Sequence, residues 1–149
     1  MQPTLALASE DDLEKLLPMV ARYHESEGIT SSQEERTRAL LRLLRDPKAG
    51  RVWLIGCGEA TVGYIAVCFC YSIEFGGLDS FLDEFFIVEG YRGRGLGTQA
   101  IGHIVQELRG QGIRALSLEV ANTNEPAKGL YARCGFEPRD RYSVMTRRL

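Results

Sequence analysis

Residues 91–97 read YRGRGLG, a segment in which three glycines alternate with arginine and leucine. The segment follows an apolar run and precedes a helical pattern. In the order strand, glycine loop and helix, free backbone N–H groups and the positive end of a helix dipole meet at one place. Arg92 and Arg94 add charge and forked hydrogen-bond donors. The segment therefore predicts a binding site for a phosphate-bearing ligand.

Two nucleotide-binding motifs compete for this loop. A Walker A loop needs a lysine after its glycines, and the chain has no lysine between Lys48 and Lys128. The dinucleotide fingerprint G-x-G-x-x-A fits residues 95–100, and Glu119 ends the next predicted strand near where a ribose-binding acid would lie. Against this alternative, the loop follows roughly eighty residues of other structure, and too little chain remains for a doubly wound sheet.

The pattern of elements around the loop predicts an α/β fold with the order β-α-α-β-β-β-α-β-α-β. Ser9 with Asp12 and Ser32 with Glu35 resemble capping boxes that open the first two helices. Gly58-Glu59 predicts a hairpin turn. We expect a mixed, largely antiparallel sheet of about six to seven strands with four helices. The predicted strands are 3–8, 51–57, 61–71, 81–88, 115–120 and, at an edge, 142–149.

The composition predicts a single domain over residues 1–149. A chain of 149 residues, 44% of them hydrophobic, can bury a core without disulfides. The net charge of −2 is spread over mixed acids and bases, which argues against nucleic acid or a membrane surface as the partner. No apolar run is long enough to span a bilayer, and we expect a soluble, cytoplasmic protein. Four cysteines without C-x-x-C spacing and two histidines predict no metal site.

A second motif follows the loop at a distance of about thirty residues. It reads Asn124-x-x-Ala127-x-x-Leu130-Tyr131-x-x-x-Gly135-Phe136. Together with Arg92-x-x-Gly95-x-Gly97, this pattern resembles the GNAT superfamily of acetyl-CoA-dependent N-acetyltransferases. The motifs cover residues 80–137, and the predicted order of elements resembles that of the superfamily over the whole chain.

The resemblance implies that acetyl-CoA is the co-substrate. It implies that backbone amides from Arg92 through Thr98 hold the pyrophosphate of coenzyme A, and that strand residues pair with the pantetheine arm as an added strand would. Asn124 would contact the same arm. The implied coenzyme-binding residues are Phe85, Phe86, Ile87, Arg92, Gly93, Arg94, Gly95, Leu96, Gly97, Thr98 and Asn124.

Acetyl transfer to an amine needs a neutral amine, an oxyanion donor and a proton for the departing thiolate. By the resemblance, Tyr131 protonates the coenzyme A sulfur. Glu84 is the first choice as base and Asp83 the second, and either one would bind a cationic amine. Adjacent strand residues point to opposite faces, so only one of these two enters the cleft unless a bulge intervenes. Glu119 matches a base position of ribosomal-protein alanine acetyltransferases and is a third candidate.

The sequence predicts the reaction but leaves several classes of acceptor open. The FLDEFFIVEG and TNEPAKGLY segments resemble diamine acetyltransferases, and the acids Glu74, Asp79, Asp83 and Glu84 would attract a small cationic or polyamine-like amine. A protein acetyltransferase acting on an N-terminus or a lysine is the first alternative, and a non-catalytic acyl-CoA-binding regulator is the second. By analogy with the family, the chain would form a homodimer through a sheet edge near residues 142–149. We expect His24 and His103 to take no part in catalysis.

Overall fold

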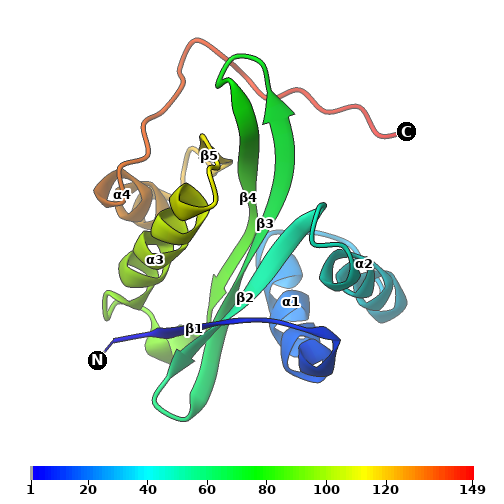
Figure 1. Cartoon of the computed structure of the whole chain (residues 1–149). Coiled ribbons are helices and arrows are strands. Elements are labelled where there is room, and N and C mark those ends of the chain that lie inside the picture. The colour runs from blue at the N-terminus through cyan, green and yellow to red at the C-terminus, as the bar shows by residue number, and fades with distance from the viewer. Residues whose placement is uncertain (1) are drawn as a thin grey trace.

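The computed structural model describes residues 2–149 and shows one sheet with helices on both faces (Figure 1). None of the helices in this part of the chain is long and apolar enough to cross a membrane. The elements, in order, are β1 (Thr4–Leu7), the 3-10 turn η1 (Glu10–Asp12), α1 (Leu13–Ser26), α2 (Gln33–Arg45), β2 (Gly50–Cys57), β3 (Ala60–Ser72), β4 (Gly77–Ile87), η2 (Glu89–Tyr91), α3 (Leu96–Gly110), β5 (Leu116–Leu118) and α4 (Glu125–Arg133).

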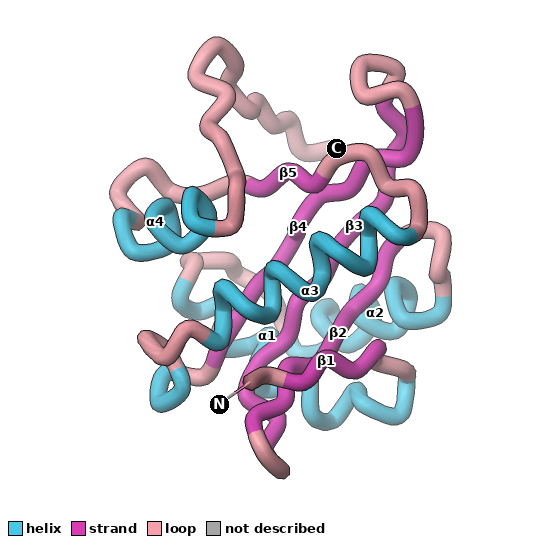
Figure 2. The backbone as a smooth tube through the Cα atoms, turned by 60° about the vertical axis from the view of Figure 1, so that its left-hand side comes forward, coloured by secondary structure: helices cyan, strands magenta, loops and turns pink. Residues whose placement is uncertain are grey.

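The sheet has the strand order β1-β2-β3-β4-β5. Neighbouring strands are antiparallel except β4 and β5, which are parallel. Helix α3 crosses one face of the sheet, and α1 and α2 lie behind the other face (Figure 2). The α/β class, the four helices and the mixed, largely antiparallel sheet agree with the sequence-based prediction. The predicted strand number was wrong, because the described residues form five strands and not six or seven.

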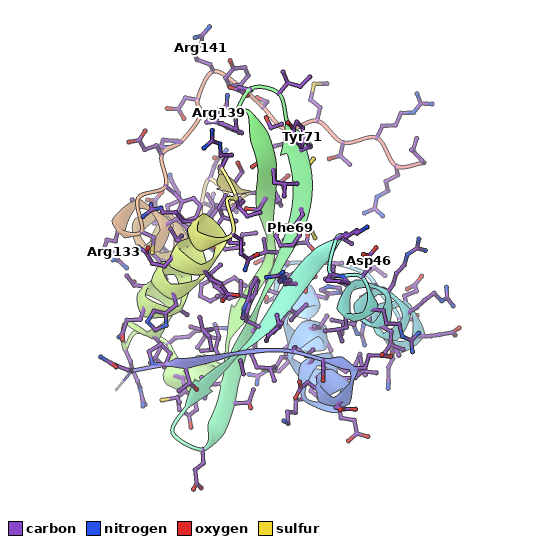
Figure 3. The ribbon with its side chains drawn as sticks, in the orientation of Figure 1. Asp46, Phe69, Tyr71, Arg133, Arg139 and Arg141 are labelled. Atoms are coloured by element: carbon purple, nitrogen blue, oxygen red, sulfur yellow. The ribbon has the colours of Figure 1, made fainter. Side chains whose placement is uncertain are left out.

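The missing strand is the predicted edge strand at residues 142–149, which form no secondary structure. A strand needs a neighbour to satisfy its backbone groups, and β5 offers an edge of only three residues. The C-terminal tail, residues 137–149, contacts the β3–β4 hairpin through Arg139, which pairs with Glu74 at 2.8 Å. The Arg139 guanidinium also lies 4.7 Å from the centre of the Tyr142 ring. Figure 3 shows Arg139 and Arg141 on this tail near the end of the β3–β4 hairpin that carries Tyr71.

Local signals in the sequence explain the starts of the first helices. Both capping boxes form: the Ser9 hydroxyl and the Asp12 carboxylate cap η1, which leads directly into α1. The Ser32 hydroxyl accepts from the Glu35 amide at 3.1 Å, and the Glu35 carboxylate accepts from the Ser32 amide at 2.7 Å. These reciprocal bonds satisfy backbone donors that a helix N-terminus leaves free. They also fix where α1 and α2 begin over the sheet.

The core has two parts, one on each face of the sheet, because successive strand residues point to opposite sides. In β3, Tyr64 and Ala66 are buried under α1 and α2, whereas Ile65 and Val67 are buried under α3. Residues of α3 that recur at helical spacing complete the second part: Leu96, Ala100, Ile101, Ile104 and Leu108.

Strand β4 contains one extra residue relative to β3. Ala66 pairs with Glu84 and the next residue, Val67, pairs with Leu82, so Asp83 has no partner on β3. Such a bulge shifts the alternation of side chains by one position. As a result Leu82 packs with the core under α3, whereas Phe86, four residues further on, packs under α1 and α2.

Helix α3 approaches its neighbours closely at Gly97. A Cβ atom at this position would lie 2.9 Å from Leu130 Cδ1 in α4 and 3.2 Å from the Phe85 ring in β4. Both distances are shorter than ordinary carbon contacts, so a larger residue would push α3 away from α4 or from the sheet. The absence of a side chain at Gly97 therefore sets how closely the two helices pack.

We predict that Gly97→Val lowers the free energy of unfolding by about 1–3 kcal/mol through overpacking. Gly102 lies on the exposed side of the same helix with no atom within 4 Å of an added Cβ. The control Gly102→Ala should leave stability unchanged or raise it by up to about 1 kcal/mol. Urea unfolding followed by circular dichroism measures both, and equal effects of the two variants would contradict the packing argument.

Candidate active site

The candidate site is a cavity of about 680 Å³ that opens where β4 and β5 separate. The two strands pair only from Ser80 to Leu82 of β4 and from Leu116 to Leu118 of β5. Within residues 2–149, no strand pairs with β4 on this side from Asp83 onward. The outer backbone groups of the second half of β4 therefore have no strand partner and, apart from the Ile87 carbonyl that Arg92 contacts, can bind an extended ligand that carries amides. Phe85, Phe86 and Ile87, the predicted pantetheine-binding residues, all line the cavity.

The glycine loop forms one wall of this cavity. Gly93 and Gly95 have φ values of 73° and 76°, a left-handed backbone that glycine adopts without strain. Gly95 is the N-cap of α3, so the free amides of the first helical turn point toward the loop. Six residues of the predicted phosphate site line the cavity: Arg92, Gly93, Gly95, Leu96, Gly97 and Thr98.

The two loop arginines have different places. Arg92 lines the cavity, donates from Nε to the Ile87 carbonyl at 2.7 Å, and places its guanidinium 5.4 Å from the centre of the Phe86 ring. It thus ties the loop to the end of β4. Arg94, also predicted to bind the coenzyme, does not line the cavity and instead lies 5.5 Å from the Tyr91 ring.

Helix α4 supplies the opposite wall. Its N-cap is Asn124, whose Oδ1 accepts from the Ala127 amide at 3.2 Å. This bond leaves the side-chain amide nitrogen of Asn124, a residue of the cavity wall, available as a donor. Arg133, at the other end of the helix, also reaches the cavity and was not predicted from the sequence.

Tyr131 is the central side chain of this wall. Its ring packs edge-on against Phe136 with 5.7 Å between centroids, and its hydroxyl makes no hydrogen bond within residues 2–149. Burial, followed by the negative charge of Glu27, raises the pKa of Tyr131 to about 12. The phenol is therefore protonated at neutral pH and can donate its proton into the cavity.

The three carboxylates predicted as candidate bases do not all lie in the cavity. Asp83 and Glu119 line the cavity, whereas Glu84 does not. Partial burial, followed by the charge of Glu84, raises the pKa of the Asp83 carboxyl. The bulge explains the division, because Asp83 is the extra residue of β4 and Glu84 points with Phe86 toward α1.

Glu84 is held by two side chains. Its Oε1 lies 2.5 Å from His24 Nε2 on α1, and its Oε2 accepts from the Tyr64 hydroxyl at 2.7 Å. His24, which the sequence analysis left without a role, is therefore a direct partner of a predicted site residue. No sequence signal could have found this contact, since sixty positions separate the two residues.

Helix α1 also contributes cavity residues that the sequence analysis missed. Tyr23, Ser26 and Glu27 line the cavity from the C-terminal end of the helix. Their spacing of three to four positions places them on one helical face, which is the only signal that could have grouped them. The predicted acids Glu74 and Asp79 lie outside the cavity. No cluster of three or more His, Cys, Asp or Glu residues that could hold a metal ion occurs in residues 2–149.

Comparisons with known proteins agree on one family. Residues 14–136 match the model of the acetyltransferase (GNAT) family. An uncharacterized N-acetyltransferase of Bacillus subtilis (strain 168), YycN, is 39% identical over 71 residues, which are 48% of this chain and 44% of that protein. The chain thus matches less than half the length of this curated relative.

Two solved structures share the fold. An integron cassette protein, HFX_CASS3, from the mobile metagenome of Cole Harbour Salt Marsh is 33% identical with a TM-score of 0.85, over 96% of this chain and 89% of that one. A predicted acetyltransferase from Clostridium acetobutylicum, solved with acetyl-CoA, is 18% identical with a TM-score of 0.77, over 97% of this chain and 96% of that one. The family match covers most of the chain, and the protein belongs to the GNAT acetyltransferases, a family of acyltransferase enzymes.

The raised pKa of Asp83 predicts how stability depends on pH. Because the folded protein holds the carboxyl proton more tightly than the unfolded chain, the stabilising contribution of Asp83 is full below the ordinary pKa of 3.8 and is lost as pH rises through the folded value. Asp83→Asn removes this loss. The free energy of unfolding of the variant, relative to wild type, should therefore increase from pH 4 to pH 7.

Urea unfolding at several pH values measures this difference. Asp79→Asn, on the same strand but outside the cavity, is the matched control and should show a smaller change with pH. A difference between Asp83→Asn and wild type that is constant from pH 4 to pH 7 would contradict the prediction.

Proposed function

We propose that the protein transfers the acetyl group of acetyl-CoA to a primary amine, by direct attack within a ternary complex, and that the acceptor is a small cationic or polyamine-like amine. One observation carries the proposal: the glycine loop, an open strand edge, a protonated phenol and three carboxylates line the same cavity. These are the groups that binding of coenzyme A and aminolysis of a thioester require.

The donor half of the proposal rests on the loop and on β4. The first amides of α3, with Gly93 and Gly95 in left-handed conformations, suit a pyrophosphate that approaches the backbone closely. Arg92 and Arg133 supply positive charge on the cavity wall. The open edge after Asp83 offers backbone partners to the two amides of pantetheine.

The acceptor half rests on charge. The acids of the cavity wall are Glu27, Asp83 and Glu119, and they come from α1, β4 and the segment after β5. A cationic amine is attracted to such a group of carboxylates, most strongly where the cavity excludes water. Of the acid pair predicted from the sequence, Asp83 and Glu84, only Asp83 lines the cavity. Glu27, which was not predicted, also lines it.

In the proposed reaction, the neutral amine attacks the thioester carbonyl, the new C–N bond forms, and the C–S bond breaks as the intermediate collapses. Tyr131 gives its proton to the departing sulfur. A carboxylate takes the proton that the amine nitrogen loses, either directly or through one water molecule. Asp83 and Glu119 can do this from the cavity wall. Glu84, the first choice from the sequence, points toward α1, where it contacts His24.

A protein acceptor is the alternative. An N-terminal amine or a lysine side chain presents the same chemistry as a small amine, and Glu119 lies in the cavity as the resemblance to alanine acetyltransferases implies. The homodimer also stays a proposal. It is supported by the short open edge of β5 and by exposed apolar residues of the tail, Tyr142, Val144 and Met145, and sedimentation would test it.

The proposal is tested first by ligand-induced thermal stabilisation. Acetyl-CoA should raise the unfolding temperature and NAD should not, because a ligand of the folded state stabilises it in proportion to its occupancy. Acetylation of a diamine, a polyamine and a peptide with a free N-terminus then identifies the acceptor. Stabilisation by NAD alone would refute the donor assignment, and turnover of peptides alone would refute the small-amine assignment.

Replacement of Tyr131 by Phe tests the acid. We expect kcat to fall by about 10²-fold or more while the affinity for acetyl-CoA changes less than about twofold, because only the proton donor is removed. Stability should hardly change, since the hydroxyl makes no hydrogen bond within residues 2–149. Tyr142→Phe, on the exposed tail, is the matched control. An unchanged kcat for Tyr131→Phe would exclude the phenol as the acid.

A further inference from the structure

We infer that His24 is a positioning residue of this active site, which holds the Glu84 carboxylate and, through it, the bulge of β4 that carries Asp83. The inference rests on the proposed acetyl transfer and adds to it a residue of α1. Both partners are largely shielded from water, since the side chains of His24 and Glu84 are only 14% and 18% exposed. Their contact at 2.5 Å is thus unlike the flexible ion pairs of a protein surface.

Both oxygens of Glu84 are occupied on the side of the sheet that faces α1. His24 Nε2 contacts one oxygen, and the Tyr64 hydroxyl donates to the other at 2.7 Å. Burial and the charge of Glu84 raise the pKa of Tyr64, so this phenol stays protonated and acts as the donor. With two donors fixed, the carboxylate has one orientation.

The hydrogen bonds beyond His24 favour one ring nitrogen as the carrier of the proton. Arg36 donates from a guanidinium nitrogen to Ser31 Oγ at 3.2 Å and to the Ser31 carbonyl at 2.5 Å. The Ser31 hydroxyl can then give its own proton to His24 Nδ1, 2.7 Å away. Nδ1 accepts in this arrangement, which leaves the proton on Nε2, where it is donated to Glu84.

This chain of hydrogen bonds spans the two elements that form the acceptor side of the cavity. His24 lies in the last turn of α1. Three residues close to it in the sequence line the cavity: Tyr23, Ser26 and Glu27. Glu84 follows Asp83 directly in β4. The His24–Glu84 contact therefore fixes the distance between the wall that α1 provides and the carboxylate at the bulge. The glycine loop takes no part in this series of hydrogen bonds, so coenzyme binding should not depend on them.

The kinetic test compares His24→Leu with His24→Gln. Leucine removes the donor, and we expect kcat to fall at least tenfold while KM for acetyl-CoA changes less than twofold. Glutamine carries an amide N–H near the position of Nε2 and should restore at least part of kcat. His103→Gln, on the exposed side of α3, is the matched control and should behave as wild type. A His24→Leu enzyme with kcat within twofold of wild type overturns the inference.

A double variant distinguishes positioning from a general loss of stability. If His24 acts through Glu84, then His24→Leu should lower kcat much less in a Glu84→Gln background than in wild type. Independent, multiplicative losses would overturn the inference.

A measurement without substrate separates this inference from the proposed function. The chain has only two histidines, so ¹⁵N-resolved spectra of the imidazole rings, with His103→Gln for assignment, report on His24 directly. We expect a slowly exchanging proton on His24 Nε2 and none on Nδ1, and a change of this signal in Ser31→Ala. A proton on Nδ1 with Nε2 free overturns the inference. A wild-type protein that acetylates no amine would instead refute the proposed function, while the spectra still decide whether the pair exists.

Discussion

The single extra residue in β4 is the constraint on which the rest of the site depends. Asp83 has no partner on β3, and the side chains that follow it are shifted to the opposite faces. The pairing of β4 with β5 also ends at Leu82, next to this bulge. One irregularity thus coincides with three features: an open strand edge, a carboxylate in the cavity, and Glu84 directed toward α1.

Much of this architecture could be predicted from the sequence because its signals are local. Capping boxes at Ser9 and Ser32 mark helix starts through contacts between residues three positions apart. The glycine loop depends on backbone conformations that glycine alone adopts easily, and six of its seven predicted residues line the cavity. The final strand could not be predicted reliably, since a strand exists only where another segment pairs with it, and residues 142–149 have β-type side chains but no such partner in the fold.

The parts that the sequence did not reveal all depend on contacts between distant elements. Glu84 and Asp83 are neighbours in the chain, and only the pairing with β3 decides which of them enters the cavity. His24 gains its role from a residue sixty positions away. Tyr23 and Glu27 lie at the end of a helix whose start was predicted from its capping box. The rotation of this helix over the sheet, which brings both residues to the cavity, follows from packing.

The division of the cavity between separate segments has a consequence for how such a protein can change over evolutionary time. The proposed coenzyme side consists of the end of β4, the glycine loop and α4, whereas the proposed acceptor side combines the end of α1 with Asp83 and Glu119. Substitutions at Tyr23, Ser26 and Glu27 can therefore remodel one substrate pocket and leave the loop and its glycines untouched. A descendant of this chain can therefore change its proposed acceptor by substitutions within its first thirty residues, while the residues of the proposed coenzyme side stay the same.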